Sequence, residues 1–362
     1  MEKNLVLVIN PGSTSTKLAI FKGTEKLIQE NLDHDTNDLD KFVKITDQYD
    51  YRKEAILKWM NEHQIKHEEL LAVVGRGGLL RPMPSGTYLV TEPMLEDLKV
   101  GIQGEHASNL GGMIANAIAK QENIDAYIAD PVAVDEFEPL ARVSGMPEIT
   151  RRSLVHALNI RAIAHSYAAD NQTTIDTLNL VVGHLGGGIS IVPMKKGKII
   201  DANNANEMGP FSPERTGGLP VGQLVKMCFS GDYTFDELKK KMRGKGGLVA
   251  YLGTNDAREV IKKIESGDEK AKLIFEAMGY QIAKEIGAMA TVLNGEVDAI
   301  LMTGGIAYSK YLMDYIQSHV AFIAPFVVKP GEDEMEALNL GVLRAISGED
   351  QVKIYEKEVQ IK

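Results

Sequence analysis

The chain has 362 residues, of which 44% are hydrophobic and 25% charged. This composition is typical of a globular protein with enough apolar side chains for two domains. The formal net charge of −10 disfavours nucleic acids and anionic membranes as partners, because the overall field of the protein would repel their phosphates. An anionic substrate would therefore need a locally positive site.

The cysteine content and the first residues predict a reducing compartment. Cys228 is the only cysteine, which excludes an intrachain disulfide, and its apolar neighbours predict a position in the core. The apolar run at residues 5–9 is as short as a strand and is followed by Pro11-Gly12, unlike a signal peptide. No later stretch has the length of a membrane span. We therefore expect a cytoplasmic protein.

Two segments share one pattern of apolar strand, small-residue turn, second strand and second turn. They occupy residues 5–23 and residues 178–197. Landmarks in the two halves of the chain are separated by 174 positions: Gly12 and Gly186, Gly23 and Gly197, and the strand ends at Asp130 and Gly304. We interpret this as a duplicated α/β unit with a boundary near residue 150. Two unrelated α/β domains with similar turns remain the alternative.

The first turn of each hairpin is a candidate phosphate-binding loop, because small residues leave backbone N–H groups and hydroxyls accessible. The chain contains no Gly-x4-Gly-Lys-Ser/Thr motif, and both glycine-rich turns run into strands instead of helices. These two features disfavour the Walker A and Rossmann types of site. A glycine-rich hairpin is weak evidence by itself, since any turn that needs a positive φ favours glycine.

This layout resembles the superfamily of actin, Hsp70 and sugar kinases, in which two duplicated ribonuclease H-like ATPase domains surround a central cleft. The resemblance implies that both hairpins bind phosphates, that the acidic strand end Asp130 places a metal ion, and that a strand-Gly-Gly-helix turn binds adenosine. The residues implied are Asn10, Ser13, Ser15 and Lys17 in the first hairpin, Gly186, Gly187 and Gly188 in the second, and Gly304, Gly305 and Ile306 in the adenosine turn.

Four motifs narrow the resemblance to the acetokinase family, from near the first residue to about residue 345. Residues 10–17 are similar to its Asn-x-Gly-Ser-Ser-Ser-x-Lys motif, with threonine at two places. Residues 184–190 are similar to His-Leu-Gly-Asn-Gly-x-Ser, with Gly187 in place of asparagine, a departure typical of the butyrate kinases within the family. Residues 213–218 resemble a Gly-Thr-Arg-Ser-Gly-Asp element, and residues 256–258 an Asp-x-Arg nucleotide element.

The resemblance implies a role for each matching position. Residues 1–150 would form the domain on the acyl side, with the tail 347–362 as a candidate to pack on it, and residues 151–346 the domain on the nucleotide side. The implied catalytic residues are Arg76, Asp130, His156 and Arg215, with His184, Asp256 and Arg258 on the nucleotide and Mg²⁺ at Asp130 and Glu334. Asp135 is an alternative to Asp130, and Glu334 has acidic neighbours within residues 332–336.

The chemistry of carboxylate phosphorylation calls for such residues independently. A carboxylic acid with a pKa near 4 is ionised at neutral pH and needs no general base. The obstacle is repulsion between the carboxylate and the γ-phosphoryl group of ATP, which cations and fixed donors relieve. The planar fork of arginine suits this task better than lysine. We expect Arg76 to position the carboxylate and Arg215 to stabilise the phosphoryl oxygens, with His156 and Asn10 as donors.

Three positions bear on the length of the acid. Where the family's acetate kinases place phenylalanine and two valines, this chain has Val155, Gly77 and Gly78. Smaller side chains would leave room for extra methylenes, each worth about 0.8 kcal/mol when buried. The expected substrate is therefore butyrate or a branched short-chain acid, with acetate or propionate as the alternative.

Other classes and structural roles stay open at this stage. A sugar or polyol kinase could use Asp130 as a base, but it would leave Arg76 and Arg215 without a task, and a non-catalytic ATP-binding protein would need a partner-binding extension. Either arginine could form a surface ion pair, Asp130 could cap the turn at Pro131, and His156 could be a core histidine. The resemblance also implies a homodimer or higher homo-oligomer and domain closure over the substrates.

Overall fold

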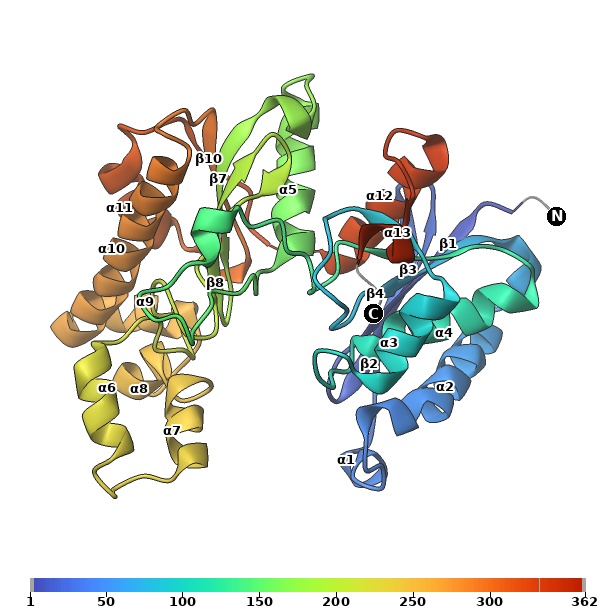
Figure 1. Ribbon diagram of the computed structural model, residues 1–362, viewed down its shortest axis with the longest axis horizontal. Helices are drawn as coiled ribbons and strands as arrows, with labels where there is room; N and C mark the ends of the chain where they lie inside the picture. Colours follow the sequence, from blue (N-terminus) through green and yellow to red (C-terminus); the bar gives the residue numbers. More distant parts are fainter. Residues whose placement is uncertain (1–2, 332, 360–362) are drawn as a thin grey trace. The chain divides into compact units, whose positions relative to one another are not determined.

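A computed structural model describes residues 3–331 and 333–359. It contains two compact units, of which the first comprises Met1–Asp135 together with Asp333–Lys362 and the second comprises Glu136–Glu332. The chain thus builds most of the first unit, then the second, and returns to complete the first (Figure 1). These limits differ from the expected ones, since the first unit ends before residue 150 and the segment from Asp333 onward belongs to it.

The first unit is built on a seven-stranded sheet with the order β12-β5-β6-β4-β1-β2-β3. Its strands are β1 (Leu5–Pro11), β2 (Ser15–Lys22), β3 (Glu25–Asp33), β4 (Leu70–Arg76), β5 (Thr87–Leu89), β6 (Ala126–Ala129) and β12 (Lys353–Ile354). The first three form the antiparallel meander that the sequence predicts, and β4 and β6 run parallel to β1. The interior residues of β1 are fully buried, because helices cover both faces of the sheet there.

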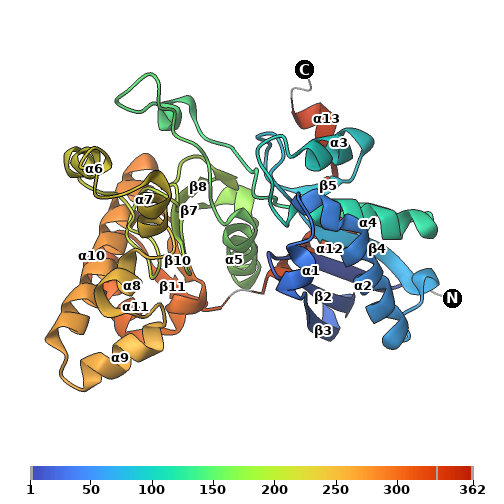
Figure 2. The same ribbon diagram turned by 90° about the horizontal axis from the view of Figure 1, so that it is seen from below.

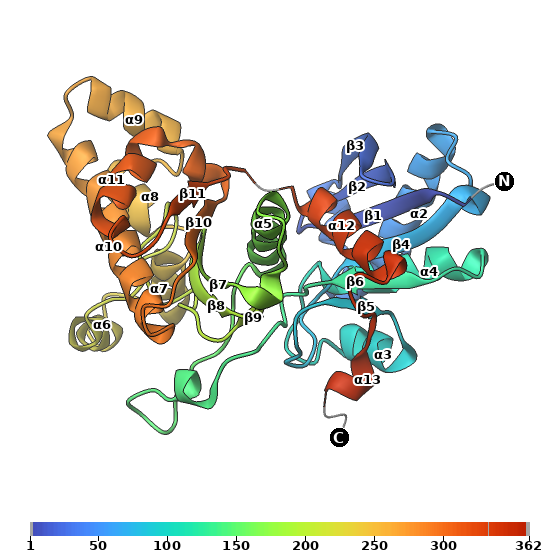
Figure 3. The same ribbon diagram turned by 90° about the horizontal axis from the view of Figure 1, so that it is seen from above.

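Helices cover the two faces of this sheet. The helices of this unit are α1 (Thr36–Leu39), α2 (Tyr49–Glu62), α3 (Glu92–Val100), α4 (Asn109–Gln121), α12 (Glu334–Ser347) and α13 (Tyr355–Glu358), with 3-10 turns η1 (Ile45–Gln48) and η2 (His67–Glu69). Gly112 of α4 lies against Ile128, whereas Gly341 of α12 lies against Ala129. Because consecutive strand residues face opposite sides, α4 and α12 cover opposite faces. Figure 3 shows α12 beside β1 and β4.

The C-terminal tail is part of the first unit. β12 pairs in parallel with β5, Lys353 lying opposite Tyr88. Tyr355 is fully buried, and its hydroxyl donates a 2.8 Å hydrogen bond to the carboxylate of Asp97. These contacts join β12 to β5 and α13 to α3.

The second unit is built on a five-stranded sheet with the order β11-β10-β7-β8-β9. Its strands are β7 (Asn179–Leu185), β8 (Ile189–Lys195), β9 (Lys198–Ile199), β10 (Ala299–Thr303) and β11 (Phe326–Val328). Again the first three form an antiparallel meander and the last two run parallel to its first strand. The order β9-β8-β7-β10-β11 therefore repeats β3-β2-β1-β4-β6, which supports a duplicated unit.

One of the three landmarks used to detect the repeat is wrong. β6, which precedes Asp130, takes the place of β11, whereas β10, which precedes Gly304, takes the place of β4. The chain between the third and fourth strands of the repeat is much longer in the second unit, where it holds the helices from α6 (Val221–Cys228) to α10 (Glu269–Val292). An equal spacing at that landmark was therefore a coincidence. The counterpart of Gly304-Gly305 is Gly77-Gly78, directly after Arg76.

Helices lie on both faces of the second sheet as well (Figure 2). The helices of this unit are α5 (Ala157–Asp170), α6 (Val221–Cys228), α7 (Phe235–Met242), α8 (Gly247–Leu252), α9 (Ala257–Glu265), α10 (Glu269–Val292) and α11 (Lys310–Val320), with 3-10 turns η3 (Pro139–Arg142), η4 (Ile175–Thr177) and η5 (Gly305–Tyr308). Across residues 3–331 and 333–359, none of the helices has the length and apolar character that crossing a membrane requires.

Cys228 does not lie in the core. The cysteine is exposed at the end of α6, and that helix has no buried residue. The expectation of a core position rested on its apolar neighbours, but Val225 is 49% and Phe229 87% exposed. Apolar spacing alone cannot say whether a helix face meets another element of the same chain.

Candidate functional site

Three neighbouring strands of the first unit end at one edge of the sheet. Ile9 of β1 pairs with Gly75 of β4, and Arg76 of β4 pairs with Ala129 of β6, all in parallel. The next residues in β1 and after β6 are Asn10 and Asp130, so this edge presents an amide, a guanidinium and a carboxylate. The carboxyl ends of parallel strands are where ligands bind in α/β sheets.

Glu334 joins this edge from the first turn of α12. Its Oε2 accepts a 2.6 Å hydrogen bond from Asn10 Nδ2, and its Oε1 lies 3.5 Å from Arg76 Nη2. The neighbouring Asp333 instead caps α12 by accepting from the Glu336 amide at 2.9 Å, and it forms a 2.5 Å ion pair with Lys26.

Glu334 is thus the member of the acidic run that contacts two other predicted site residues. Glu336 is exposed in the same first helical turn. Glu332 lies outside the described residues.

One nitrogen of the Arg76 guanidinium has no hydrogen-bond partner among the described residues. Arg76 is only 9% exposed, and its Nη1 is buried with no hydrogen-bond partner within residues 3–331 and 333–359. A buried donor without a partner costs free energy, which an anion bound there would recover. This favours a ligand-binding role for Arg76 over a surface ion pair.

Asp130 has a structural task. It is 5% exposed, its Oδ1 accepts a 2.7 Å hydrogen bond from the Gly86 amide, and its own amide donates to the Gly86 carbonyl at 3.0 Å. Its φ of 38° lies in the left-handed region, which is uncommon for a residue other than glycine. The alternative interpretation as a turn residue is therefore supported, and a role in metal binding stays a prediction.

The expectation that Gly77 and Gly78 enlarge an acyl pocket is wrong. A Cβ atom at Gly77 would lie 2.4 Å from the Cβ of Pro131, and one at Gly78 would lie 2.2 Å from Asn109 Oδ1. The space that a valine side chain would occupy is thus filled by other parts of the same unit. These glycines allow close packing of the turn after β4 and leave no open volume for a substrate.

The first hairpin turn carries the other predicted residues of this unit. The Gly12 amide donates to the Ser15 carbonyl at 2.8 Å and closes the turn. Ser13 and Lys17 are exposed, and Ser15 is half-buried. A residue that sequence analysis missed, Arg52 of α2, donates hydrogen bonds to this turn from beneath.

Two histidines of the second unit lie against one another. The rings of His156, at the start of α5, and His184, near the end of β7, have centroids 4.3 Å apart and planes inclined by 34°. His156 Nδ1 is 2.9 Å from Ser190 Oγ. Val155 is buried beside this pair at 7% exposure. The structure therefore brings together two residues that the sequence places in different motifs.

Arg215 packs on the second glycine-rich turn. A Cβ atom at Gly188 would lie 2.2 Å from Arg215 Nη1, so only glycine permits this approach. The same nitrogen donates to the Ala205 carbonyl at 2.9 Å. Burial, and next the charge of Arg243, lower the pKa of the Arg215 guanidinium, with Glu214 acting in the opposite sense. A phosphoryl group would offset this unfavourable burial of positive charge.

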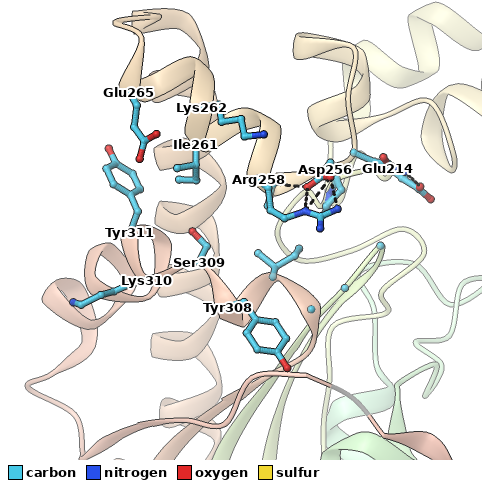
Figure 4. Close-up of a pocket in the computed structure, with 17 residues that line it drawn as sticks. Glu214, Asp256, Arg258, Ile261, Lys262, Glu265, Tyr308, Ser309, Lys310 and Tyr311 are labelled. Atoms are coloured by element: carbon cyan, nitrogen blue, oxygen red, sulfur yellow. Dashed lines mark hydrogen bonds and ion pairs between the residues drawn. The ribbon is translucent and has the colours of Figure 1, made fainter.

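A pocket of about 1110 Å³ opens in the second unit (Figure 4). The predicted residues among those that line it are Gly186, Gly187, Asp256, Arg258, Gly305 and Ile306. Gly188 and Gly304 instead lie in the turns beside it. Gly304 has a φ of 93°, and a Cβ atom there would lie 2.3 Å from the Leu185 carbonyl oxygen. This volume is of the size that small-molecule and cofactor sites have.

Asp256 and Arg258 form one unit in the wall of this pocket. Asp256 accepts a 2.8 Å hydrogen bond from the Arg258 amide at the start of α9, and its carboxylate forms a 2.6 Å ion pair with the guanidinium. The Arg258 side chain lowers the pKa of Asp256 to about 2. The dashed lines in Figure 4 show how this pairing holds the arginine, whose side chain is 87% exposed.

Several lining residues escaped sequence analysis. Ile261, Lys262 and Glu265 follow Arg258 at spacings of three, four and seven, so they share one face of α9 and point toward the pocket (Figure 4). Tyr308, Ser309 and Tyr311 follow the Gly305 turn. The helical spacing after residue 258 was a usable signal for the first group.

Comparison with known proteins gives consistent results. The Acetokinase family matches residues 149–323. A protein named probable butyrate kinase 2 from Caldanaerobacter subterraneus subsp. tengcongensis is 57% identical over 97% of this chain and 99% of its own length. Butyrate kinase 2 of Clostridium acetobutylicum is 53% identical over 97% of this chain and 99% of its own length.

A solved structure supports the fold. The crystal structure of Porphyromonas gingivalis acetate kinase superposes with a TM-score of 0.80 at 20% identity, covering 95% of this chain and 100% of that one. At this identity the likeness concerns the fold alone. The predicted class, a duplicated α/β fold of the actin-like type, is confirmed.

Proposed function

Because the chain belongs to the acetokinase family, we propose that it transfers the γ-phosphoryl group of ATP to butyrate, giving ADP and butyryl phosphate. The observation that carries the proposal is the 57% identity, over 97% of the chain, with a relative named as a probable butyrate kinase. The geometry of both units supports it, since each presents an arginine suited to an anion.

The first unit would bind the carboxylate group of the acid. The unpaired Nη1 of Arg76 is a buried donor, and Asn10 and Glu334 fix the rest of this cluster. The carboxylate of the acid would accept from Arg76 and so recover the cost of that buried donor. No proton needs to be removed, because the acid is already ionised.

The second unit would bind the nucleotide. The pocket bounded by Gly187, Asp256 and Ile306 suits an adenosine group. On the side of the turn that contains Ile306, the pocket is lined by the apolar side chain of Ile306 and by glycine backbone. Arg215, held on Gly188, would donate to the oxygens of the transferred phosphoryl group. His156 and His184 lie near the end of β7 and would donate further hydrogen bonds.

Magnesium is part of the proposal. The donor set fits this ion in kind, because Mg²⁺ in kinases takes one or two carboxylates and completes its shell with phosphates and water. Within the described residues no group of three or more acidic, histidine or cysteine side chains forms a cage. Glu334 and Asp130 would therefore hold an ion that arrives with ATP, and its charge would reduce the repulsion between the reactants.

Trapping of the product by hydroxylamine tests the proposal. Acyl phosphates give hydroxamates and sugar phosphates do not, so the assay separates a carboxylate kinase from a sugar or polyol kinase. We expect hydroxamate formation with ATP and Mg²⁺, fastest in kcat/KM for butyrate or isobutyrate among acetate, propionate, butyrate and isobutyrate. A clear preference for acetate would overturn the choice of acid, and the absence of any hydroxamate would overturn the carboxylate kinase itself.

Two further expectations accompany this function. We propose that the protein acts in the cytoplasm, where ATP and Mg²⁺ are available, and that it forms a homodimer or a higher homo-oligomer. The exposed apolar side chains of α6, such as Val225, agree with association of copies. Light scattering on the purified protein measures the assembly directly, and a monomeric mass would contradict this part.

A further inference from the structure

A fully buried arginine lies beneath the first hairpin turn. Arg52 of α2 has an exposure of 0%, and its guanidinium donates to the carbonyl oxygens of Gly12 at 2.9 Å, Ser15 at 2.9 Å and Ser13 at 3.0 Å. It thus binds three of the peptide groups that make the turn. The function described above assigns no task to this residue.

The remaining contacts of Arg52 are also neutral. Nη1 donates to Thr16 Oγ1 at 3.1 Å, and Nε and Nη2 both donate to Gln48 Oε1, at 3.0 and 2.9 Å. Every hydrogen-bond partner of this guanidinium in the described residues is therefore a carbonyl, a hydroxyl or an amide. Buried charges in proteins are normally paired with an opposite charge. Here no carboxylate of the described chain plays that part, which leaves positive charge under the turn.

The contacts also set the direction of the peptide groups. In a trans peptide the C=O of one residue and the N–H of the next point in opposite directions. Since the carbonyls of Gly12 and Ser13 point down to Arg52, the amides of Ser13 and Thr14 point away from it. Neither amide donates a hydrogen bond within residues 3–331 and 333–359. Two adjacent free N–H groups above a buried cation are the kind of arrangement to which anions bind in proteins.

We infer that Arg52 is a positioning residue that fixes this turn from beneath and supplies, through its unpaired charge, part of the affinity of the turn for phosphate. The inference rests on the proposed kinase function, together with the expectation from the family resemblance that this first hairpin turn binds a phosphate group of ATP. It adds a residue that does not touch the ligand and acts through the turn. Without an anion the charge of Arg52 is buried at a cost, and the bound phosphate offsets that cost.

The neighbouring Gln48 offers a test that keeps the arginine in place. In Gln48→Glu a carboxylate takes the position that already accepts from Nε and Nη2, so the fork keeps its partners while its charge is compensated. We expect the KM for ATP to rise on the order of tenfold, with kcat within about threefold of the wild type and the Tm maintained. A purely structural role of Arg52 would leave the KM unchanged.

The matched control is Gln29→Glu. Gln29 is exposed in β3 of the same unit, so this variant makes the same change of residue and of net charge away from the turn. It should keep the wild-type KM for ATP. An equal rise of KM in both variants would show a general charge effect and overturn the inference, as would a wild-type KM in Gln48→Glu.

A second pair of variants decides the matter if Gln48→Glu does not fold. Arg52→Lys keeps the charge and Arg52→Gln removes it, while both lose the five-donor fork and should lower the Tm alike. The inference requires Arg52→Lys to keep a KM for ATP several-fold below that of Arg52→Gln. Equal values of KM in the two variants would show that the charge has no role.

Calorimetric binding of ATP separates this inference from the proposed function. Binding does not require turnover, so the loss of about tenfold in affinity in Gln48→Glu is expected whether or not any acid is phosphorylated. A wild-type protein that binds ATP but forms no hydroxamate would overturn the proposed function. The inference on Arg52 would then be decided by the ATP affinities of Gln48→Glu and Gln29→Glu alone. A wild-type protein that forms hydroxamate, with equal ATP affinity in Gln48→Glu and Gln29→Glu, would overturn Arg52 alone.

Discussion

Asn10 and Glu334 are separated by 324 positions in the chain and joined by a 2.6 Å hydrogen bond. The contact exists because the chain returns from the second unit to add α12 to the first sheet, with its first turn at the carboxyl ends of β1 and β4. The last acidic motif of the sequence thereby meets the first polar one. Glu334 contacts both Asn10 and Arg76, so a change of charge at this residue should have the largest effect on the cluster.

Replacement of Glu334 by glutamine should lower kcat on the order of a hundredfold. The amide keeps the shape and can still accept from Asn10, but it removes the negative charge beside Arg76 and the carboxylate proposed for Mg²⁺. The loss should be largest at limiting Mg²⁺, and it is measured as kcat at a series of Mg²⁺ concentrations. The Tm should change little because Glu334 is only half-buried.

Glu336→Gln is the matched control. The residue lies in the same first turn of α12 but is exposed, and no contact joins its side chain to Asn10 or Arg76 within the described residues. It should retain the wild-type kcat. If both variants lose activity equally, the effect belongs to the charge of the helix N-terminus and not to Glu334.

Arg215→Lys and Arg215→Ala should both have a much lower kcat than the wild type. Arg215 rests on Gly188 and donates to Ala205, and a lysine keeps the charge but loses the planar fork that reaches both the loop and a phosphoryl oxygen. We expect kcat to fall on the order of a hundredfold or more in both variants, with a smaller change in the KM for ATP. Steady-state kinetics in the hydroxamate assay measures both constants.

Arg243→Gln serves as the comparison for Arg215. Arg243 contributes to lowering the pKa of Arg215, so its removal relieves repulsion without touching the guanidinium itself. Its kcat should stay close to the wild type. A hundredfold loss in Arg243→Gln would mean that the total positive charge near this loop, and not the fork of Arg215, governs the reaction.

The sequence predicted the repeated hairpins, because a turn of small residues between apolar strands is a local pattern. It did not predict which strands are equivalent in the two units. That depends on the number of residues inserted between β9 and β10, and spacing along the chain cannot reveal it. For this reason Gly304 was matched with Asp130 and not with Gly77.

Contacts between distant segments were the other limit. Nothing near Arg52 in the sequence shows that this arginine of α2 lies under residues 12–16, since no motif contains it. Likewise Gly77 and Gly78 have the same composition whether they line a pocket or pack against Pro131 and Asn109. Burial against another element is a property of the folded chain, and the sequence of a turn does not record it.

The stability of the first unit should fall as the pH is lowered below neutrality. Burial, and next the charge of Arg52, lower the pKa of His34 from 6.5 to about 4, with Asp33 acting in the opposite sense. Between about pH 6.5 and 4, His34 is therefore protonated in the unfolded chain but stays neutral in the folded chain. Stability is therefore fully present above about pH 6.5 and is lost as the pH falls toward 4. Thermal unfolding at pH 7, 6 and 5 measures the trend.

His34→Gln should flatten this dependence. The Nε2 of His34 lies 2.8 Å from Thr16 Oγ1, and a glutamine oxygen can accept a hydrogen bond from that hydroxyl without introducing a titratable group. The drop in Tm between pH 7 and pH 5 should shrink by a few °C relative to the wild type. An unchanged drop in His34→Gln would assign the acid sensitivity to other groups.

Val155→Phe should shift the enzyme toward shorter acids. With Gly77 and Gly78 excluded as sources of pocket volume, Val155 is the remaining position at which sequence comparison predicts more room for the acid, and it is buried beside His156. A phenylalanine would displace roughly the two extra methylenes of butyrate, each worth about 0.8 kcal/mol, so kcat/KM for butyrate relative to acetate should fall at least tenfold. The hydroxamate assay with both acids measures this ratio.

Val143→Phe makes the same change at a position that is 71% exposed and should leave the ratio as in the wild type. If the ratio is also unchanged in Val155→Phe, with activity retained, the length of the acid is read by residues other than Val155.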